Sequence, residues 1–152
     1  MTITSRLAEL DVTLPDASAP AGNYVPFVVV GDMVYISGQI SVGADGPITG
    51  KLGADLDVDA GAKAAKACAL SLIAQLQVAC GGDLDRVVKV VKLGGFVNST
   101  PEFDQQPAVI NGASDFMVAV FGDVGRHARA AVSAASLPFG VAVEIEGVFQ
   151  IK

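Results

Sequence analysis

The chain has few of the residues that hold metal ions or form disulfides. Its 152 residues include one histidine, two cysteines and no tryptophan. Structural zinc takes four ligands, drawn mostly from cysteine and histidine, so this composition argues against a zinc site. If Cys68 and Cys80 share one helix, they lie roughly 18 Å apart, which is too far for a disulfide. We therefore expect no bound metal and a buried, apolar role for Cys68.

Positive charge is also scarce. Ten lysines and arginines stand against 16 acidic residues, which gives a formal net charge of −6 and a pI near 4.5. No cluster of Lys or Arg offsets this balance, and a negative surface repels phosphate backbones. A nucleic-acid partner is therefore not expected.

Long apolar runs are missing, although the chain as a whole is apolar. No run reaches the roughly 18–20 residues that cross a bilayer. The N-terminal sequence MTITSRLAEL lacks the charged-then-apolar pattern of a signal peptide. These absences predict a cytoplasmic protein without a membrane partner. The mean hydropathy is nevertheless +0.52, and we expect the surplus apolar surface to lie in subunit interfaces.

Several motifs of common enzyme classes are absent. The sequence contains no GxGxxG that opens a helix after a strand, no P-loop, no GxSxG and no CxxC. No nucleotide or other cofactor is predicted. His127 has no accompanying Ser/Asp or Cys/Asn pattern of the kind that a catalytic histidine needs. We therefore expect structural or surface roles for His127 and for its neighbour Arg126.

The length fits a single domain, residues 1–152. The predicted order is β-β-α-β-α-β-β in an α+β fold, with both helices on one face of the sheet. A short early helix and loops at Val42–Lys51 and Gly122–Gly125 complete the prediction. The main elements are expected at Phe27–Val30, Met33–Ser37, Asp59–Ala79, Arg86–Phe96, Pro107–Phe121, Ala128–Ser133 and Val141–Ile151.

Local patterns support these elements. In Asp59–Ala79 the apolar residues recur at three- and four-residue spacings, which is typical of one helical face. Gly31-Asp32 separates two β-rich runs by two residues, as in a hairpin turn. Pro107 suits the first turn of a helix. The Asn111-Gly112 pair normally signals a turn, so it conflicts with the helix predicted around it.

The segment His127–Gly147 places charges inside strand-like apolar runs. A charge that is stripped of water costs several kcal/mol unless it is paired or used, so Arg129, Glu144 and Glu146 each need an explanation. Strand periodicity puts both glutamates on the face opposite the aliphatic residues. Two readings stay open: a solvated face where Arg129 pairs with a glutamate of an adjacent strand, or a site where Arg129 binds a ligand carboxylate through two parallel hydrogen bonds.

Three blocks together point to a known family. They are Tyr24 with the following VVVGDMVYISGQI, the run VVKLGGFVNST, and HARAAVSAASLPFGVAVEIEG. In the third block, R-x-x-V-x-x-x-x-L-P is followed by V-x-V-E-I-E. The sequence resembles the YjgF/Rid family, the reactive intermediate (enamine/imine) deaminases, which are also called endoribonuclease L-PSP-like. The resemblance runs from about residue 20 to the end, and residues 1–20 form an N-terminal extension.

The resemblance implies a chorismate-mutase-like fold assembled as a homotrimer, with the sheets in a central barrel and ligands in clefts between subunits. It assigns Arg129 as the clamp for a substrate carboxylate and Glu144 as the group that orients the attacking water, and it leaves Glu146 structural. Asn111 matches the family pattern only with a one-residue gap. At the position of Ala131 the family often has cysteine, and the backbone at this position contacts the ligand. Further substrate-binding positions implied by the resemblance are Tyr24, Ser37, Asn111 and Ala131.

The implied reaction is hydrolysis of reactive 2-imino acids of the 2-aminoacrylate type to 2-keto acids and ammonia, without metal or cofactor. The alternative is a trimer of the same family that binds a small carboxylate without turnover. The ribonuclease activity in the family label conflicts with the acidic balance of this chain. Pro101–Gly125 departs from the family pattern, so the cleft is expected to accept a different substrate.

Overall fold

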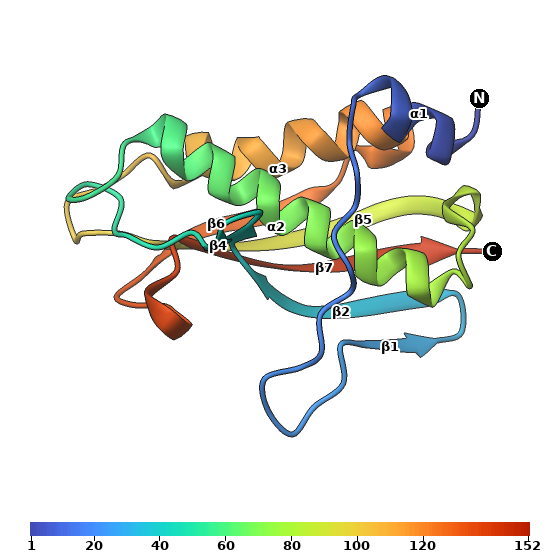
Figure 1. Cartoon of the computed structure of the whole chain (residues 1–152), viewed down its shortest axis with the longest axis horizontal. Coiled ribbons are helices and arrows are strands. Elements are labelled where there is room, and N and C mark those ends of the chain that lie inside the picture. Colours follow the sequence, from blue (N-terminus) through green and yellow to red (C-terminus); the bar gives the residue numbers. More distant parts are fainter.

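The computed structural model describes residues 1–152, and it contains a five-stranded sheet with its two long helices on one face (Figure 1). The predicted α+β class and the order of the main elements are confirmed. The helices and strands are α1 (Ile3–Glu9), β1 (Phe27–Val30), β2 (Met33–Ile40), β3 (Val42–Gly43), β4 (Gly46–Pro47), α2 (Val58–Ala79), β5 (Val87–Asn98), α3 (Gln106–Phe121), β6 (Ala128–Ala134) and β7 (Val143–Ile151).

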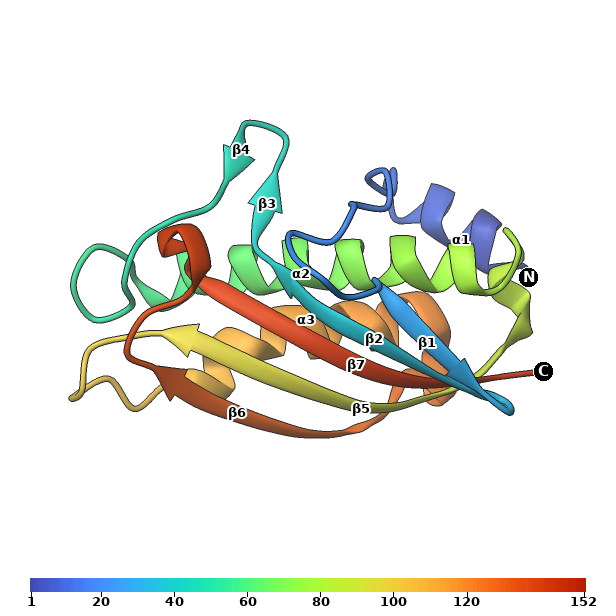
Figure 2. The same ribbon diagram turned by 90° about the horizontal axis from the view of Figure 1, so that it is seen from below.

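The strands follow the order β1-β2-β7-β5-β6. Only β5 and β6 run parallel, and the other neighbours are antiparallel. Figure 2 shows the face of the sheet that no helix covers, which we call the open face. The opposite face carries the core, where Leu72 of α2, Met117 of α3 and Phe149 of β7 are fully buried. Strand β6 lies at one edge of the sheet, and β7 lies in the middle.

Helix α2 begins after its capping residue, Asp57. The Asp57 side chain accepts a hydrogen bond from the backbone N–H of Ala60 at 2.8 Å, which satisfies one of the free N–H groups at the helix start. The buried face of α2 includes Leu72, Ile73 and Leu76, as the three- and four-residue spacing predicted. Many alanines on this face let the helix lie close to the sheet.

Helix α3 continues through the Asn111-Gly112 turn signal. A Cβ atom on Gly112 would overlap the backbone carbonyl of Ala62 in α2, so the glycine permits the close crossing of the two helices. Packing against α2 therefore outweighs the local turn preference. By length and composition alone the segment Gln106–Gly125 could span a membrane, but 44% of it is buried inside this fold, and α3 packs on α2 and the sheet.

Two predicted loops contain regular structure. Val42–Lys51 includes the short antiparallel ribbon of β3 and β4, in which Val42 pairs with Pro47. Gly122–Gly125 forms a 3-10 turn. The sequence did not predict these two elements because both segments are short and contain glycine. They have too few residues to show a periodic pattern of apolar side chains.

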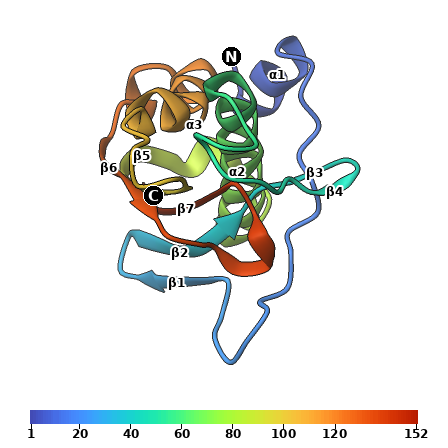
Figure 3. The same cartoon turned by 90° about the vertical axis from the view of Figure 1, so that its left-hand side faces the viewer.

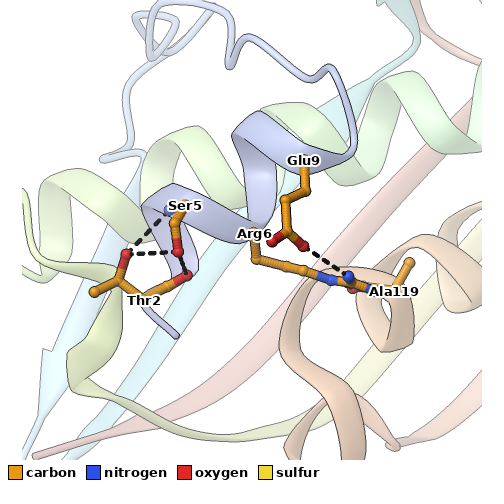
Figure 4. Close-up of polar contacts among 5 residues, drawn as sticks. All are labelled: Thr2, Ser5, Arg6, Glu9 and Ala119. Carbon is orange, nitrogen blue, oxygen red and sulfur yellow. Dashed lines mark hydrogen bonds and ion pairs between the residues drawn. The ribbon is translucent and has the colours of Figure 1, made fainter.

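The early helix α1 docks on the C-terminal part of α3 (Figure 4). Thr2 caps it by accepting a hydrogen bond from the N–H of Ser5 at 3.0 Å. The Nε atom of Arg6 donates to the carbonyl of Ala119 at 2.8 Å, and its guanidinium pairs with Glu9 at 3.2 Å. These contacts fix the start of the chain to the helical layer.

From α1 the chain runs across α2 and past the sheet before it enters β1 (Figure 3). We call Val12–Pro26 the N-terminal segment. Val12 and Leu14 pack against the core. The buried amide of Gln75 in α2 donates to the carbonyl of Ser18 at 2.8 Å. The segment is therefore attached to the core at its start and to α2 at its middle.

The helix crossing at Gly112 gives a stability prediction. In a free helix Gly→Ala adds up to about 1 kcal/mol of stability, but here the methyl group meets the α2 backbone. We expect Gly112→Ala to lower the free energy of unfolding by roughly 2 kcal/mol, as measured by denaturant titration. Asp115→Ala, at an exposed position of the same helix, is the control. A Gly112→Ala variant more stable than wild type would contradict the close crossing.

Candidate functional site

The two glutamates of β7 lie on the open face of the sheet. Their neighbours Val143 and Ile145 are fully buried on the helix side. Glu144 is partly buried and Glu146 is exposed. The prediction that both carboxylates share the face opposite the aliphatic residues is confirmed, because alternation along β7 leaves them no other side.

A bulge in β2 makes room for the Glu144 carboxylate. The register between β2 and β7 shifts between Ile36 and Gln39, at the Ser37-Gly38 pair. A Cβ atom on Gly38 would overlap Oε2 of Glu144, so the carboxylate occupies the space that any other residue would fill. The space beside the glycine of the S-G-Q block is thus filled by a side chain more than one hundred residues later in the chain.

Burial raises the pKa of Glu144, and the nearby charge of Glu146 raises it further. The Glu144 carboxyl group has no basic partner, since the ion pairs of the chain are Arg6–Glu9 and Arg126–Asp123. A carboxyl group with a raised pKa exchanges protons closer to neutral pH, which suits general acid–base chemistry.

Glu144 forms part of a groove of about 1080 Å³. Two other residues that the sequence singled out, Tyr24 and Ser37, line the same groove. The Ser37 hydroxyl donates to the carbonyl of Val25 at 2.8 Å. The Tyr24 hydroxyl accepts from the N–H of Ala21 at 3.2 Å, and its ring is half exposed. Residues far apart in the sequence thus come together here.

Arg129 lies on the other face of the sheet. Arg129 pairs with Leu93 of β5, and Leu93 pairs with Gly147 of β7. The side chain of Arg129 therefore extends from the helix face at the edge strand β6. One guanidinium nitrogen donates to Ser114 Oγ at 3.1 Å and the other donates to the Pro107 carbonyl at 3.2 Å. Arg129 forms no ion pair, and the reading in which a neighbouring strand's glutamate neutralises it is wrong.

Asn111 and Ala131 lie near Arg129 by their positions in the fold. Asn111 is exposed on α3, one turn after Pro107 and one turn before Ser114, so it shares the helix face that Arg129 contacts. Ala131 follows Arg129 by two residues on the same side of β6 and packs against the core.

Sequence reasoning missed Ser114 and gave His127 too small a part. The Ser114 hydroxyl lies 2.9 Å from Nε2 of His127, and Nδ1 of His127 lies 2.7 Å from the Gly125 carbonyl. With Nδ1 protonated, the contacts form a chain from Arg129 to Ser114, to His127 and to the Gly125 backbone. These contacts place His127 behind Ser114 as a supporting group. No local pattern in the sequence indicates this contact, because Ser114 comes from α3.

The sequence-predicted residues therefore form two groups. The groove group is Tyr24, Ser37 and Glu144, and the edge group is Arg129, Asn111 and Ala131. Arg129 and Glu144 are separated by two strand spacings and by three residues along the strands, about 14 Å between Cα atoms, and they project from opposite faces. One small molecule cannot contact both within a single chain.

No group of three or more His, Cys, Asp and Glu side chains converges as metal ligands. Cys68 and Cys80 are both free and buried. The Cys68 thiol donates to the Val143 carbonyl at 3.4 Å, and burial strongly raises its pKa. It therefore behaves as a small core residue, as predicted.

Comparison with known proteins agrees with this architecture. Residues 4–145 match the family described as "YjgF/chorismate mutase-like, putative endoribonuclease". Protein TCP17 of Trypanosoma cruzi is 50% identical over 152 residues, which cover 99% of this chain and 94% of that protein.

Two solved structures illustrate the range of similarity. The protein Atu1372 from Agrobacterium tumefaciens, of unknown function, is 47% identical with a TM-score of 0.92, and the match covers 99% of this chain and 92% of that one. Escherichia coli TdcF with bound serine is 27% identical with a TM-score of 0.59, and the match covers 90% of this chain and 94% of that one.

The raised pKa of Glu144 gives a prediction for stability against pH. The folded protein holds this proton more tightly than the unfolded chain, so the ionised carboxylate costs stability above its folded-state pKa. The cost disappears below the ordinary glutamate pKa, about 4.3. We expect Glu144→Gln to be more stable than wild type at pH 7, and the gain to shrink as the pH falls to 4 in denaturant titrations.

The control for this prediction is Glu102→Gln, which removes one negative charge at an exposed position of a chain with net charge −6. If Glu144→Gln gains no more stability at pH 7 than this control, burial of Glu144 has no energetic consequence.

Proposed function

We propose a function from the premise that the chain belongs to the YjgF/chorismate mutase-like family. The protein hydrolyses 2-imino acids, and their enamine tautomers, to 2-keto acids and ammonia. The observation that carries the proposal is the guanidinium of Arg129, which no acid of the chain neutralises. It lies at the edge of the sheet among hydrogen-bonding groups, where a ligand carboxylate supplies the missing charge.

Arg129 has donors to spare for this task. A guanidinium presents five N–H groups, and two of its nitrogens each use one hydrogen bond, to Ser114 and to the Pro107 carbonyl. These two bonds restrict the orientation of its plane. The remaining N–H groups are suited to two parallel bonds with a carboxylate, which fix a ligand in direction as well as in position.

We propose that the edge group of one subunit meets the groove group of the next, in a homotrimer with clefts between subunits. The separation of Arg129 and Glu144 within one chain supports this arrangement. So does the apolar open face, where Val28, Tyr35 and Val132 are 48%, 48% and 46% exposed. Burying these side chains between copies gains roughly 25 cal/mol for each Å² of apolar area removed from water.

In the proposed reaction, Glu144 moves protons. Water attacks the C=N carbon while Glu144 accepts one of its protons, and the C–O bond forms as the C=N π electrons move to nitrogen. The resulting carbinolamine then breaks its C–N bond. Counted from the N-protonated imine, the carboxyl group returns its proton to the amine nitrogen. As ammonia leaves, the hydroxyl group gives its proton to the Glu144 carboxylate and becomes the keto group. A carboxyl group with a raised pKa serves in both directions, and Arg129 supplies positioning.

The ligand class has support from a relative. The structure of Escherichia coli TdcF holds serine, a small molecule that carries an α-carboxylate next to a nitrogen-bearing carbon. A 2-imino acid has the same arrangement, with a C=N bond in place of the amine. The acidic charge of this chain favours this class of ligand over RNA.

Loss of Arg129 tests the proposal. We expect Arg129→Ala to lower kcat/KM for imine hydrolysis on the order of 100-fold, because the substrate loses its charged partner. The assay follows 2-keto acid release from imines that a dehydratase supplies. Arg126→Ala is the matched control, since Arg126 is three residues away, largely exposed, and paired only with Asp123; its activity should equal that of wild type.

Two outcomes would contradict the proposed enzymatic activity. Equal rates for wild type and Arg129→Ala would remove the enzymatic role. If 2-keto acids raise the Tm of wild type but not of Arg129→Ala, and no imine turns over, the protein binds carboxylates without catalysis.

A second prediction concerns Ser114. Its hydroxyl accepts from Arg129 and contacts His127, so we expect Ser114→Ala to loosen the guanidinium and raise KM about tenfold while kcat changes little. Ser136→Ala, in an exposed loop, is the control in the same steady-state assay. An equal fall in kcat for both variants would show that Ser114 does not act through substrate binding.

A further inference from the structure

We propose that the part of the groove between the N-terminal segment and α2 binds the side chain of the substrate, and that it selects 2-imino acids with long, uncharged, apolar side chains. The inference rests on the proposed function, because Glu144 lies in this groove. A substrate whose reacting carbon is held at Glu144 can direct its side chain along the groove, beneath the N-terminal segment.

The groove is larger than the reaction requires. Its volume of about 1080 Å³ slightly exceeds the range of clefts that enclose drug-sized ligands, roughly 300–1,000 Å³. A three-carbon imino acid would leave most of it empty. The continuous space beyond Glu144 therefore has room for an extended side chain.

Small residues of α2 create this room. Ala67 and Ser71 are one helical turn apart and both line the groove. Their short side chains leave space between α2 and the N-terminal segment. Across from them the segment contributes Leu14, Pro15 and Pro20. Apolar side chains on both sides, including Leu70 of α2, favour an apolar occupant, and each buried CH₂ group adds about 0.8 kcal/mol, roughly fourfold in kcat/KM.

The charges of the groove exclude an acidic side chain. Its charged lining residues are Asp16, Glu144 and Glu146, and no Lys, Arg or His lines it. A second carboxylate on the substrate would meet like charges without a counterion. The α-carboxylate avoids this repulsion because Arg129 of the edge group receives it.

The groove keeps its shape without a ligand. Gln75 is 2% exposed, and its side-chain amide donates a hydrogen bond to the Ser18 carbonyl at 2.8 Å. Leu14 packs on the core, and Tyr24 bonds the backbone of Ala21. These attachments hold the N-terminal segment above α2, so binding of an extended side chain costs little ordering of the protein.

The test compares imino acids that an amino-acid oxidase generates from alanine, norvaline, norleucine and glutamate, with semicarbazide trapping the unhydrolysed imine. We expect kcat/KM to rise on the order of 50-fold from the alanine to the norleucine derivative, which has three more CH₂ groups. The glutamate derivative should fall at least tenfold below that of norleucine. Ser71→Leu fills the groove and should abolish the rise along the series.

Gln77→Leu, elsewhere on α2 and outside the groove, is the control and should retain the wild-type series. Equal kcat/KM along the wild-type series would overturn the groove proposal and leave the deaminase proposal standing. If no imine is hydrolysed, the Tm shifts with pyruvate and 2-oxohexanoate decide the groove independently: a larger shift with 2-oxohexanoate supports it, and equal or absent shifts overturn it.

Discussion

The structure depends on the alternating burial of β7, the central strand. Val143, Ile145, Phe149 and Ile151 fill the core beneath the helices, and this burial compels Glu144 and Glu146 to the opposite face. A one-residue shift in register would place two carboxylates in the core, at a cost of several kcal/mol each. The glycines of β2 and β5 follow from this register: Gly38 lies under Glu144, and a Cβ on Gly94 would come within 2.9 Å of Glu146.

The same register divides the polar groups into two halves. Strand β6 pairs in parallel with β5 at the edge of the sheet, and its helix-side positions hold Arg129 and Ala131 beside α3. Glu144 belongs to the groove on the other side. Each half has an unneutralised charge, positive at the edge and negative in the groove. A complete site for a zwitterionic or imino-acid ligand needs both charges, and two copies of the chain can supply them together.

The sequence predicted those elements in which the residue pattern within the element itself shows which side chains are buried. The spacing in α2, the Gly31-Asp32 hairpin and the two-residue period of β7 each gave the observed structure. Contacts between distant segments were not predictable in this way. The donation from Arg129 to Ser114 depends on the docking of α3 on β6, and the path of the N-terminal segment depends on one buried amide, Gln75. The turn preference of Asn111-Gly112 is not realised, because it is local whereas the helix crossing at Gly112 is tertiary.

The central claim is that Arg129 and Glu144 act on one substrate from two subunits. Mixing the inactive variants Arg129→Ala and Glu144→Gln, after unfolding and refolding together in equal amounts, tests it most directly. In a closed ring, a cleft is intact when its Arg129 comes from one variant and its Glu144 from the other, so about one quarter of the clefts regain activity. We expect recovery of about a quarter of wild-type activity in the mixture. No recovery above the separately refolded variants, with mixed oligomers confirmed by mass, would contradict it.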